Sequence, residues 1–220
     1  MKHTDFLSQR DRYWLSSLVL VVVAVLAWSW IGATDRMTWW LEAFPAFIAT
    51  PVLVMTYRRF PLTRLAYVLI AIHMCILFVG AHYTYAHVPL FDWLRDQFHL
   101  QRNDYDKVGH LAQGFVPAIV AREILIRQRV VARGWWLVFL VICICMTISA
   151  CYELLEWAVA LMEGSSAEAF LGTQGDPFDT QSDMFCALIG AVTAQLLLSR
   201  LHDLQLMQFI APKSVTVGKT

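Results

Sequence analysis

A carboxylate and an imidazole occur at helical spacing near the middle of the sequence. Asp106 and His110 are four residues apart, so on a helix both side chains lie on one face. Such a pair can bind a cation or relay protons. Alternatively, Asp106 caps a helix N-terminus, where negative charge is favourable, and His110 packs among neighbouring helices. The sequence leaves both interpretations open.

A second pair of ionisable residues lies within the most apolar part of the chain. Glu153 and Glu156 are three residues apart, and the apolar run that follows them extends to Met162. This setting indicates that both carboxylates lie inside a membrane, where they repel each other unless one is protonated or a cation lies between them. We expect at least one of them to be functional; hydrogen bonding to neighbouring helices is the structural alternative.

A third group of carboxylates occupies the stretch GTQGDPFDTQSDM, residues 172–184, which contains no Lys or Arg. Its three aspartates are Asp176, Asp179 and Asp183. Gly172, Gly175 and Pro177 are typical turn residues, and Thr180 with the aspartate three residues later has the spacing of a capping box. These local roles explain part of the polar content, but they do not explain why three carboxylates are placed here.

These three segments together predict one polar site. Its catalytic candidates are Asp106, His110 and Glu156, with one carboxylate as general base. Its metal-ligand candidates are His110, Glu153, Glu156, Asp176, Asp179 and Asp183. Oxygen-rich ligands with an imidazole favour Mg²⁺, Mn²⁺ or Zn²⁺ over copper, so the cofactor implied is a divalent cation. The zinc-protease, nucleophile-elbow and P-loop motifs are absent from the sequence, so no motif identifies a reaction.

The composition defines the environment in which this site must be built. The chain has 220 residues, of which 58% are hydrophobic and only 15% are charged. Its mean hydropathy is +0.54, which is typical of a membrane protein. The lipid bilayer is therefore the expected partner. The formal net charge is zero, which argues against a nucleic-acid partner because no basic excess is available to offset phosphates.

Hydropathy predicts an all-α bundle of about six membrane-spanning helices in one multi-pass domain, residues 1–220. The expected spans are about 15–33, 39–57, 62–85, 107–123, 135–162 and 183–201. Pro45 and Pro51 predict a kink or break in the second span. Residues 89–98 begin with proline and have an apolar stripe, which predicts a short helix lying on the membrane surface.

The distribution of Lys and Arg predicts the orientation of these spans. Basic residues are concentrated in the N-terminal tail and in the loops after the second and fourth spans. Both termini are therefore expected in the cytoplasm, with the polar site on the periplasmic side of a bacterial inner membrane. The first apolar run is nearly long enough to cross a bilayer and ends in Trp28 and Trp30, so it is expected to be a retained helix rather than a cleaved signal peptide. The five cysteines fall in or at the ends of spans and are expected to be packing residues.

Three segments carry a resemblance to a known family. The segments are DYDKVGHLAQGF, YELLEW and FLGTQGDPFDTQSDMFCALIGA, and with them the chain resembles the YjdF-like bacterial inner-membrane proteins over residues 10–205. A shorter likeness, confined to Asp106-Lys107-x-x-His110, is to the VanZ-like membrane proteins. The first resemblance implies a multi-pass inner-membrane protein and supplies no reaction.

Three functions are compatible with these patterns. The first is a periplasm-facing carboxylate–histidine site that binds a divalent cation and acts on a lipid or envelope precursor. The second is a small proton-coupled transporter, for which His73 near mid-membrane and the expected break in the second span are the best support. The third is a structural or partner-binding membrane protein whose polar cluster holds helix ends together.

Overall fold

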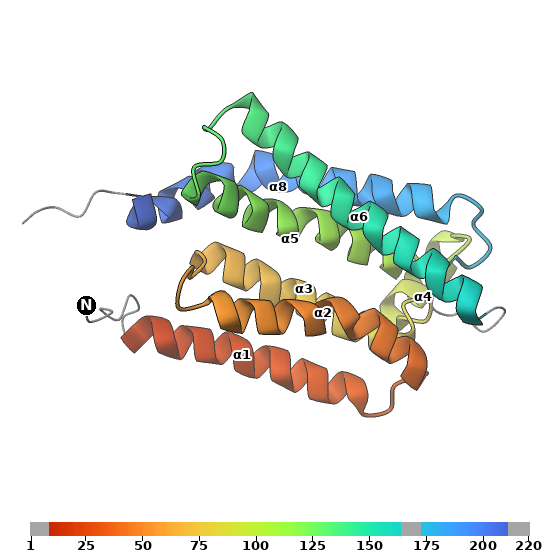
Figure 1. Cartoon of the computed structure of the whole chain (residues 1–220). Coiled ribbons are helices and arrows are strands. Elements are labelled where there is room, and N and C mark those ends of the chain that lie inside the picture. The colour runs from red at the N-terminus through yellow and green to blue at the C-terminus, as the bar shows by residue number, and fades with distance from the viewer. Residues whose placement is uncertain (1–8, 164–172, 211–220) are drawn as a thin grey trace, which may run out of the picture.

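The computed structural model describes residues 9–163 and 173–210, and within them it is entirely helical, as predicted (Figure 1). The helices in chain order are α1 (Gln9–Trp30), α2 (Arg36–Thr56), α3 (Arg64–Tyr83), α4 (Pro89–Phe98), α5 (Tyr105–Arg127), α6 (Trp135–Glu163) and α8 (Asp179–Ile210). Side-chain caps begin two of them. Asp35 accepts a hydrogen bond from the backbone N–H of Thr38, which lowers the pKa of Asp35, and Thr63 caps α3 through the N–H of Ala66.

Five of these helices, α1, α2, α3, α6 and α8, are long and apolar enough to cross a membrane. Their outer surfaces carry exposed apolar side chains such as Leu20, Val54 and Leu196, as expected where lipid replaces water. The prediction of a helical membrane bundle is therefore confirmed.

α5 has the length of a membrane span but a more polar composition. It runs beside α3, α6 and α8 and packs most extensively on α8 (Figure 1). Over half of its residues are buried, including Asp106, His110, Arg122 and Glu123. Its polar side chains therefore face other helices rather than lipid.

The helices form two layers, with α1, α2 and α3 in one and α5, α6 and α8 in the other (Figure 1). In the second layer, α5 and α8 cross with their backbones in contact. A β-carbon added to Gly114 would lie 1.8 Å from the carbonyl oxygen of Ala187, and one added to Gly190 would lie 2.1 Å from that of Leu111. Only glycine permits this approach, so the crossing fixes the register of the two helices.

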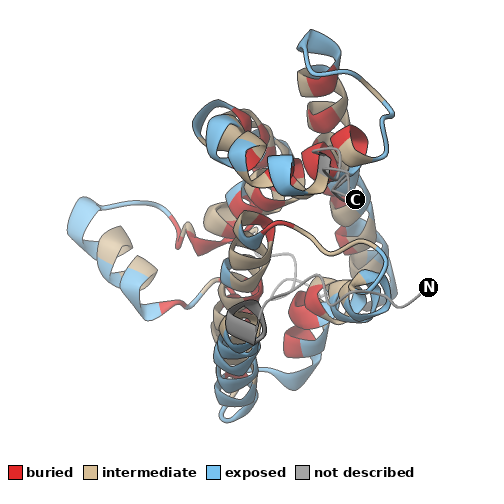
Figure 2. Cartoon of the chain, turned by 90° about the vertical axis from the view of Figure 1, so that its left-hand side faces the viewer, coloured by how far each residue is buried: buried red, intermediate tan, exposed pale blue. Residues whose placement is uncertain are grey.

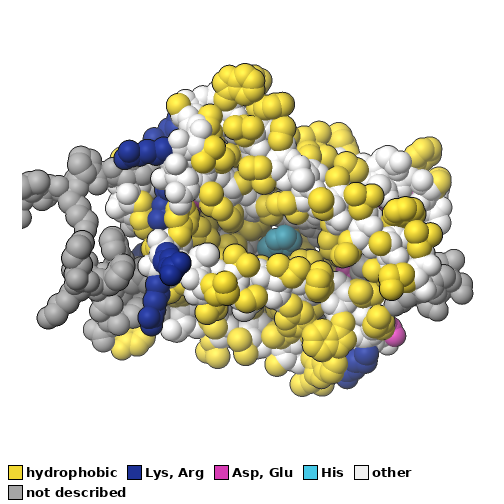
Figure 3. Space-filling model, in the orientation of Figure 1, with side chains coloured by type: hydrophobic (Ala, Val, Ile, Leu, Met, Phe, Trp, Pro, Cys, Tyr) yellow, Lys and Arg dark blue, Asp and Glu magenta, His cyan; other side chains and the backbone are white. Residues whose placement is uncertain are grey.

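The two ends of the bundle differ in charge. We call the end with the loops 57–63 and 128–134 the basic end; the beginning of α1 and the end of α8 lie there too (Figure 1). Lys and Arg side chains form a band across it (Figure 3). The acidic end carries α4 and the loop 173–178. Seen from the basic end, the buried residues face the interior between the helices and the exposed residues face outward (Figure 2).

Two elements differ from their predicted form. α8 continues beyond the predicted end near residue 201 to Ile210, because His202 and Leu206 are fully buried against the bundle. α2 is one continuous helix that contains both Pro45 and Pro51, so the prolines do not break it. The surface helix expected at 89–98 is α4. It has no buried residue and exposes Leu90 and other apolar side chains.

Candidate functional site

The acidic end brings the three predicted segments together. α5 begins at Tyr105, which places Asp106 in its first turn and His110 one turn further. α8 begins at Asp179, so Asp183 follows one turn later, and the adjacent α6 contributes Glu153 from its second half. The predicted capping roles do not hold, because Thr180 and Asp106 lie inside their helices. Asp104 occupies the N-cap position of α5 and makes no side-chain cap hydrogen bond.

His110 lies among three carboxylates, and we call these four residues the His110 cluster. Its Nε2 atom is 3.5 Å from Asp106 Oδ1 and 3.9 Å from Asp183 Oδ2. Its Nδ1 atom is 3.7 Å from Glu153 Oε1. The ring of Tyr152 meets the imidazole edge-on at 6.0 Å and covers one side. Carboxylates therefore flank both ring nitrogens of one buried histidine.

Several buried polar atoms of this cluster have no hydrogen-bond partner among residues 9–163 and 173–210. They are His110 Nδ1, Glu153 Oε1, Asp183 Oδ1 and, one turn along α5, Gln113 Nε2. His110 is 3% exposed, Asp183 1% and Glu153 7%, so bulk water does not compensate them. A buried polar group without a partner costs roughly 1–3 kcal/mol. These atoms make the cluster a candidate ligand site.

Three members of the cluster fit a metal ion. Asp106, His110 and Asp183 each offer one ligand atom, and these atoms lie within 4.8 Å of one another. Two ligands on opposite sides of one cation at ordinary bond lengths are about 4–5 Å apart, so a single ion can reach all three. One imidazole and two carboxylates suit Mg²⁺, Mn²⁺ or Zn²⁺.

The remaining predicted aspartates face an arginine instead. Arg102, in the loop before α5, is 7% exposed; it hydrogen-bonds Asp179 through NH1 and lies 3.7 Å from Asp176 and 3.6 Å from Asp106. Burial acts to lower the pKa of Arg102, but the carboxylate of Asp179 holds that pKa above its usual value. Asp106 is therefore shared between Arg102 and His110.

Two hydrogen bonds fix the loop 173–178 against the chain around Arg102. The Asn103 N–H donates to Gln174 Oε1 at 3.0 Å, and Gln174 Nε2 donates to the Asn103 carbonyl at 2.9 Å. Asp176 Oδ1 accepts from the N–H of Phe178 at 2.9 Å. The stretch is therefore a turn, as its composition indicated, and it also holds carboxylates against Arg102. Gly172 lies outside the described residues.

The role of Arg102 was missed in the sequence, because the acidic stretch itself contains no basic residue. The one available signal is its position four residues before Asp106, which would pair the two on a helix, but Arg102 lies in a loop. Its partners on α8 are more than 70 residues away in the chain, so only the tertiary structure shows them.

Glu156 and Glu42 complete the buried carboxylates of this end. Glu156 lies one turn beyond Glu153 on α6 and is 8% exposed. Glu42, on α2, is 5% exposed and faces the same interior from the other layer. Among the described residues, Glu156 has no hydrogen bond or ion pair to the His110 cluster, so the structure places it near the cluster but outside the group of three ligand atoms.

Asp106 and His110 of the cluster line a cavity of about 780 Å³ between the two layers. The cavity lies between α2, α3, α5 and α6, and most of its lining is apolar. Its polar lining residues are Glu42, His73, Tyr85, Asp106, His110, Gln113, Thr147 and Tyr152. In the space-filling view, the cavity appears as a hollow in an apolar surface, with a histidine at its bottom (Figure 3). A polar cluster at one end of an apolar cavity is typical of a ligand site.

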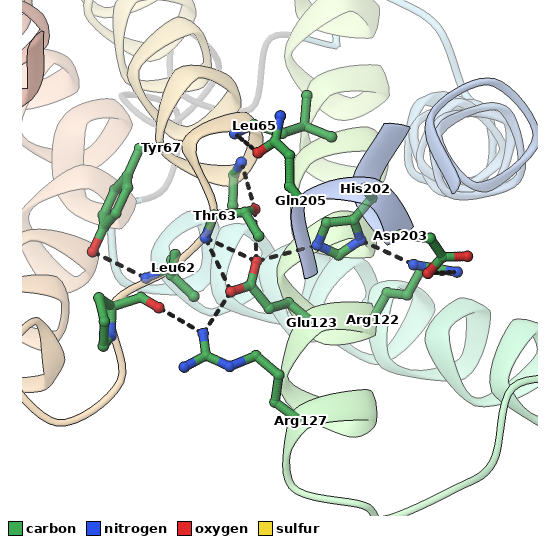
Figure 4. Close-up of polar contacts among 12 residues, drawn as sticks. Leu62, Thr63, Leu65, Tyr67, Arg122, Glu123, Arg127, His202, Asp203 and Gln205 are labelled. Atoms are coloured by element: carbon green, nitrogen blue, oxygen red, sulfur yellow. Dashed lines mark hydrogen bonds and ion pairs between the residues drawn. The ribbon is translucent and has the colours of Figure 1, made fainter. Parts of the chain in front are cut away.

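A second buried polar network lies at the basic end, where Glu123 of α5 is fully buried (Figure 4). Its carboxylate accepts hydrogen bonds from the Thr63 N–H at 3.0 and 3.1 Å and from the Thr63 hydroxyl at 2.8 Å. Arg127 NH1 donates to it at 2.7 Å, and His202 Nε2 lies 3.2 Å away. Both carboxylate oxygens are therefore satisfied within the protein.

This Glu123 network continues into α8 through His202. Arg122 NH1 lies 3.1 Å from His202 Nδ1, and Arg122 NH2 donates to Asp203 at 2.9 Å (Figure 4). An arginine can only donate, so Nδ1 must accept and the proton of a neutral His202 lies on Nε2, facing Glu123. This network could not be seen in the sequence, because Arg127 falls in the loop expected after the fourth span and His202 in the tail expected after the last one.

This chain is, then, a multi-pass helical membrane protein with a buried polar site at one end. Residues 14–204 match the family described as predicted membrane protein (DUF2238), and the chain belongs to that family. It is similar to the inner membrane protein YjdF of Escherichia coli (strain K12), with 49% identity over 195 residues, which covers 89% of this chain and 93% of that protein. The resemblance to the YjdF-like inner-membrane proteins is therefore confirmed. No solved structure matches the chain.

Proposed function

We propose that this protein binds a divalent cation at the His110 cluster and acts there on a lipid or envelope precursor. Asp106, His110 and Asp183 are the proposed ligands, and Glu153 is the carboxylate that faces the opposite nitrogen of the imidazole. The acidic end is proposed to face the periplasm.

The observation that carries this proposal is the set of buried, unpartnered polar atoms around His110. A cluster whose purpose is only to hold helices together gains stability by pairing its polar atoms, as the Glu123 network does. Here buried nitrogen and oxygen atoms point at one another without hydrogen bonds among the described residues. A cation bound by Asp106, His110 and Asp183 would offer a partner to the Asp183 carboxylate, while His110 Nδ1 and Glu153 Oε1 face each other at 3.7 Å.

The chemistry of such a site follows from the residues that surround it. The cation would polarise a carbonyl or phosphoryl oxygen of the substrate, or lower the pKa of a bound water. Glu153 lies beside the imidazole, and Glu156 lies one turn away, so either could take a proton from an attacking group. The apolar cavity would hold the hydrocarbon part of the precursor.

Cation binding is tested directly by calorimetric titration of the purified, chelator-treated protein with Mg²⁺, Mn²⁺ and Zn²⁺. The parent protein is expected to bind one of them, and Asp183→Asn and His110→Ala are expected to abolish that binding. Asp96→Asn and His99→Ala are the matched controls, because both residues are exposed and lie on or beside α4. Unchanged titrations in Asp183→Asn would refute the cation site.

Action on a precursor is tested in cells that lack the native protein and carry one variant each. Lipid analysis of the envelope is expected to show one accumulated species in cells with Glu156→Gln or Asp183→Asn, and none in cells with the parent or with Asp96→Asn. Identical lipid profiles in all four strains would contradict the proposed action on a precursor. The cation site would still be tested separately by the titration.

A second candidate, a proton-coupled transporter, is favoured by one observation. His73 lines the same cavity as Glu42 and His110, so ionisable groups extend from the acidic end toward mid-membrane. Transport would require His73 as much as His110. If His73→Ala abolishes the cellular role as completely as His110→Ala, while cation titrations show no binding, the transporter is the better description.

A further inference from the structure

The cavity has its mouth in the side of the bundle rather than at either end. Lining residues on three helices are also exposed on the apolar outer surface: Phe44, Ile48 and Val52 on α2, Ile148 on α6 and Ile124 on α5. In Figure 3 the hollow is surrounded by apolar side chains, away from the Lys and Arg band. Because that surface faces lipid in a membrane, the cavity opens to the hydrocarbon interior of the bilayer.

The cavity is long in the direction of the membrane normal. Along α5 its lining forms one stripe that begins at Asp106 and ends at Ile124, and at 1.5 Å per residue this stripe is about 27 Å long. Along α2 the lining runs from Glu42 to Leu53, which is about 16 Å. One leaflet contributes about 15 Å of hydrocarbon, so the cavity is at least one leaflet deep.

The carboxylates of the lining lie at one end of this length, and His73 of α3 and Thr147 of α6 are its polar groups nearer the middle. Glu42, Asp106 and His110 lie in the first turns at the acidic end, and Gln113 is the next polar lining residue on α5. Beyond it the α5 stripe consists of Val116, Pro117, Val120, Ala121 and Ile124. The cavity therefore has the polarity of a single amphiphile, with a polar head at the acidic end and a hydrocarbon chain toward the middle of the membrane.

We infer that the cavity takes the hydrocarbon chain of a membrane lipid that enters sideways between α2 and α6, with its head group at the His110 cluster. This rests on the proposed function for the identity of the cluster as a cation site. The head group that fits this site carries a phosphate. The carboxylates alone would repel such an anion, but a bound Mg²⁺ or Mn²⁺ accepts phosphate oxygens as further ligands. The chain is at least as long as one leaflet is thick.

α2 and α6 are the elements that admit the chain. They belong to different layers, and among the described residues neither packs extensively on the other, whereas α2 packs on α3 and α6 packs on α5 and α8. Bulky side chains on the facing sides of α2 and α6 would therefore close the mouth without disturbing a packed interface. Val52 and Ile148 are suitable positions, since both line the cavity and both are partly exposed.

The test is photocrosslinking in vesicles that contain phosphatidylglycerol with a diazirine at the end of one acyl chain. The parent protein is expected to be labelled on the cavity stripe of α5, within residues 116–124. The blocked variant Val52→Trp, Ile148→Trp is expected to lose this labelling several-fold. The matched variant Val54→Trp, Leu154→Trp places the same side chains on the same helices at exposed residues outside the cavity, and it should be labelled like the parent.

The outcomes separate the chain site from the cation site. Labelling confined to outer-surface residues such as Val54, or equal labelling of α5 in the blocked and matched variants, overturns the inference. Loss of labelling in the blocked variant with cation titration unchanged supports it. If the titration shows no cation in the parent but α5 is still labelled, the proposed function fails and the lateral chain site stands. Repeating the labelling with a diacylglycerol that bears the same probe but no phosphate tests the head group, because labelling equal to that by phosphatidylglycerol would contradict recognition of a phosphate.

Discussion

The two ends of the α5–α8 pair both bury ionisable residues, but they differ in whether those residues have hydrogen-bond partners. At the basic end, Glu123 accepts hydrogen bonds from Thr63, Arg127 and His202, and it is 0% exposed. At the acidic end, His110 and Asp183 are equally inaccessible, yet His110 Nδ1 and Asp183 Oδ1 have no hydrogen-bond partner in the ranges described. One network is complete within the protein, and the other leaves buried polar atoms without a hydrogen-bond partner among the described residues.

Under the proposed function, the difference separates polar residues that stabilise the fold from polar residues that bind. A buried ion pair with all its hydrogen bonds made contributes structural uniqueness and is costly to break. A buried cluster with unmade hydrogen bonds lowers stability in the absence of a ligand, a pattern that is common at functional sites. The comparison predicts that substitutions at the two ends have opposite signatures in stability and binding.

The largest effect on stability is expected for Glu123→Ala. This change leaves Arg127, His202 and the backbone N–H of Thr63 buried without their acceptor, and breaking a buried pair in this way costs about 3–5 kcal/mol. Thermal unfolding of the detergent-solubilised protein should show a large loss, while cation titration of the folded fraction is unchanged. A small loss would mean that the Glu123 network is not the structural one.

The next effect concerns binding rather than folding. With a cation at 100 times its dissociation constant, the parent should gain about 2.7 kcal/mol of stability. Asp183→Asn should gain nothing, because a ligand is lost. In chelator the same variant should be at least as stable as the parent, since a buried carboxylate beside Asp106 and Glu153 is removed. A marked loss of stability in chelator would instead indicate a purely structural Asp183.

Arg102→Gln should have an intermediate effect that depends on the cation. Arg102 is the positive charge held against Asp179, Asp176 and Asp106, so its loss in chelator should cost about 2 kcal/mol. Divalent cation should restore much of that loss, because it replaces a positive charge among the same carboxylates. Unfolding curves with and without Mg²⁺ measure the difference. Equal losses of stability in both conditions would show that the carboxylates around Arg102 are not part of the cation site.

The smallest effect is expected for Asp203→Asn at the basic end. Its carboxylate pairs with Arg122 at 2.9 Å and Arg133 at 3.2 Å, but it is 37% exposed and partly screened by solvent. Exposed pairs of this kind contribute about 1 kcal/mol or less. A melting curve within error of the parent, or slightly below it, is expected. A loss as large as that of Glu123→Ala would show that the network's stability comes from its outer pairs.

Much of the fold could be predicted because membrane helices have a strong one-dimensional signal. Runs of about 20 apolar residues identified five spans that the structure confirms as helices, and Pro89 with the apolar stripe behind it identified α4. The proximity of Asp106 and His110 followed from helical periodicity alone. The gathering of Glu153 and Asp183 around His110 followed from assigning three helix ends to one side of the membrane.

What could not be predicted depends on contacts between distant residues. Hydropathy ended the last span near residue 201 because Arg200, His202 and Asp203 interrupt the apolar run, whereas His202 is buried by pairing with Arg122 and Glu123. Arg102 lies in a loop, and its partners depend on how that loop packs against α8. A sequence pattern shows that a charge is present, but only packing shows whether another charge satisfies it.

The polar composition of α5 has a consequence for how the protein is made. A helix that carries Asp106, Lys107, Arg122 and Glu123 is costly to leave alone in lipid, and its most extensive partner, α8, is synthesised last. During biosynthesis α5 must therefore be sheltered by helices that already exist, with α3 available before it and α6 directly after it. We expect a nascent chain that ends before α8 to hold α5 loosely in the membrane, and the arrival of α8 to be the step that commits the bundle to its final topology.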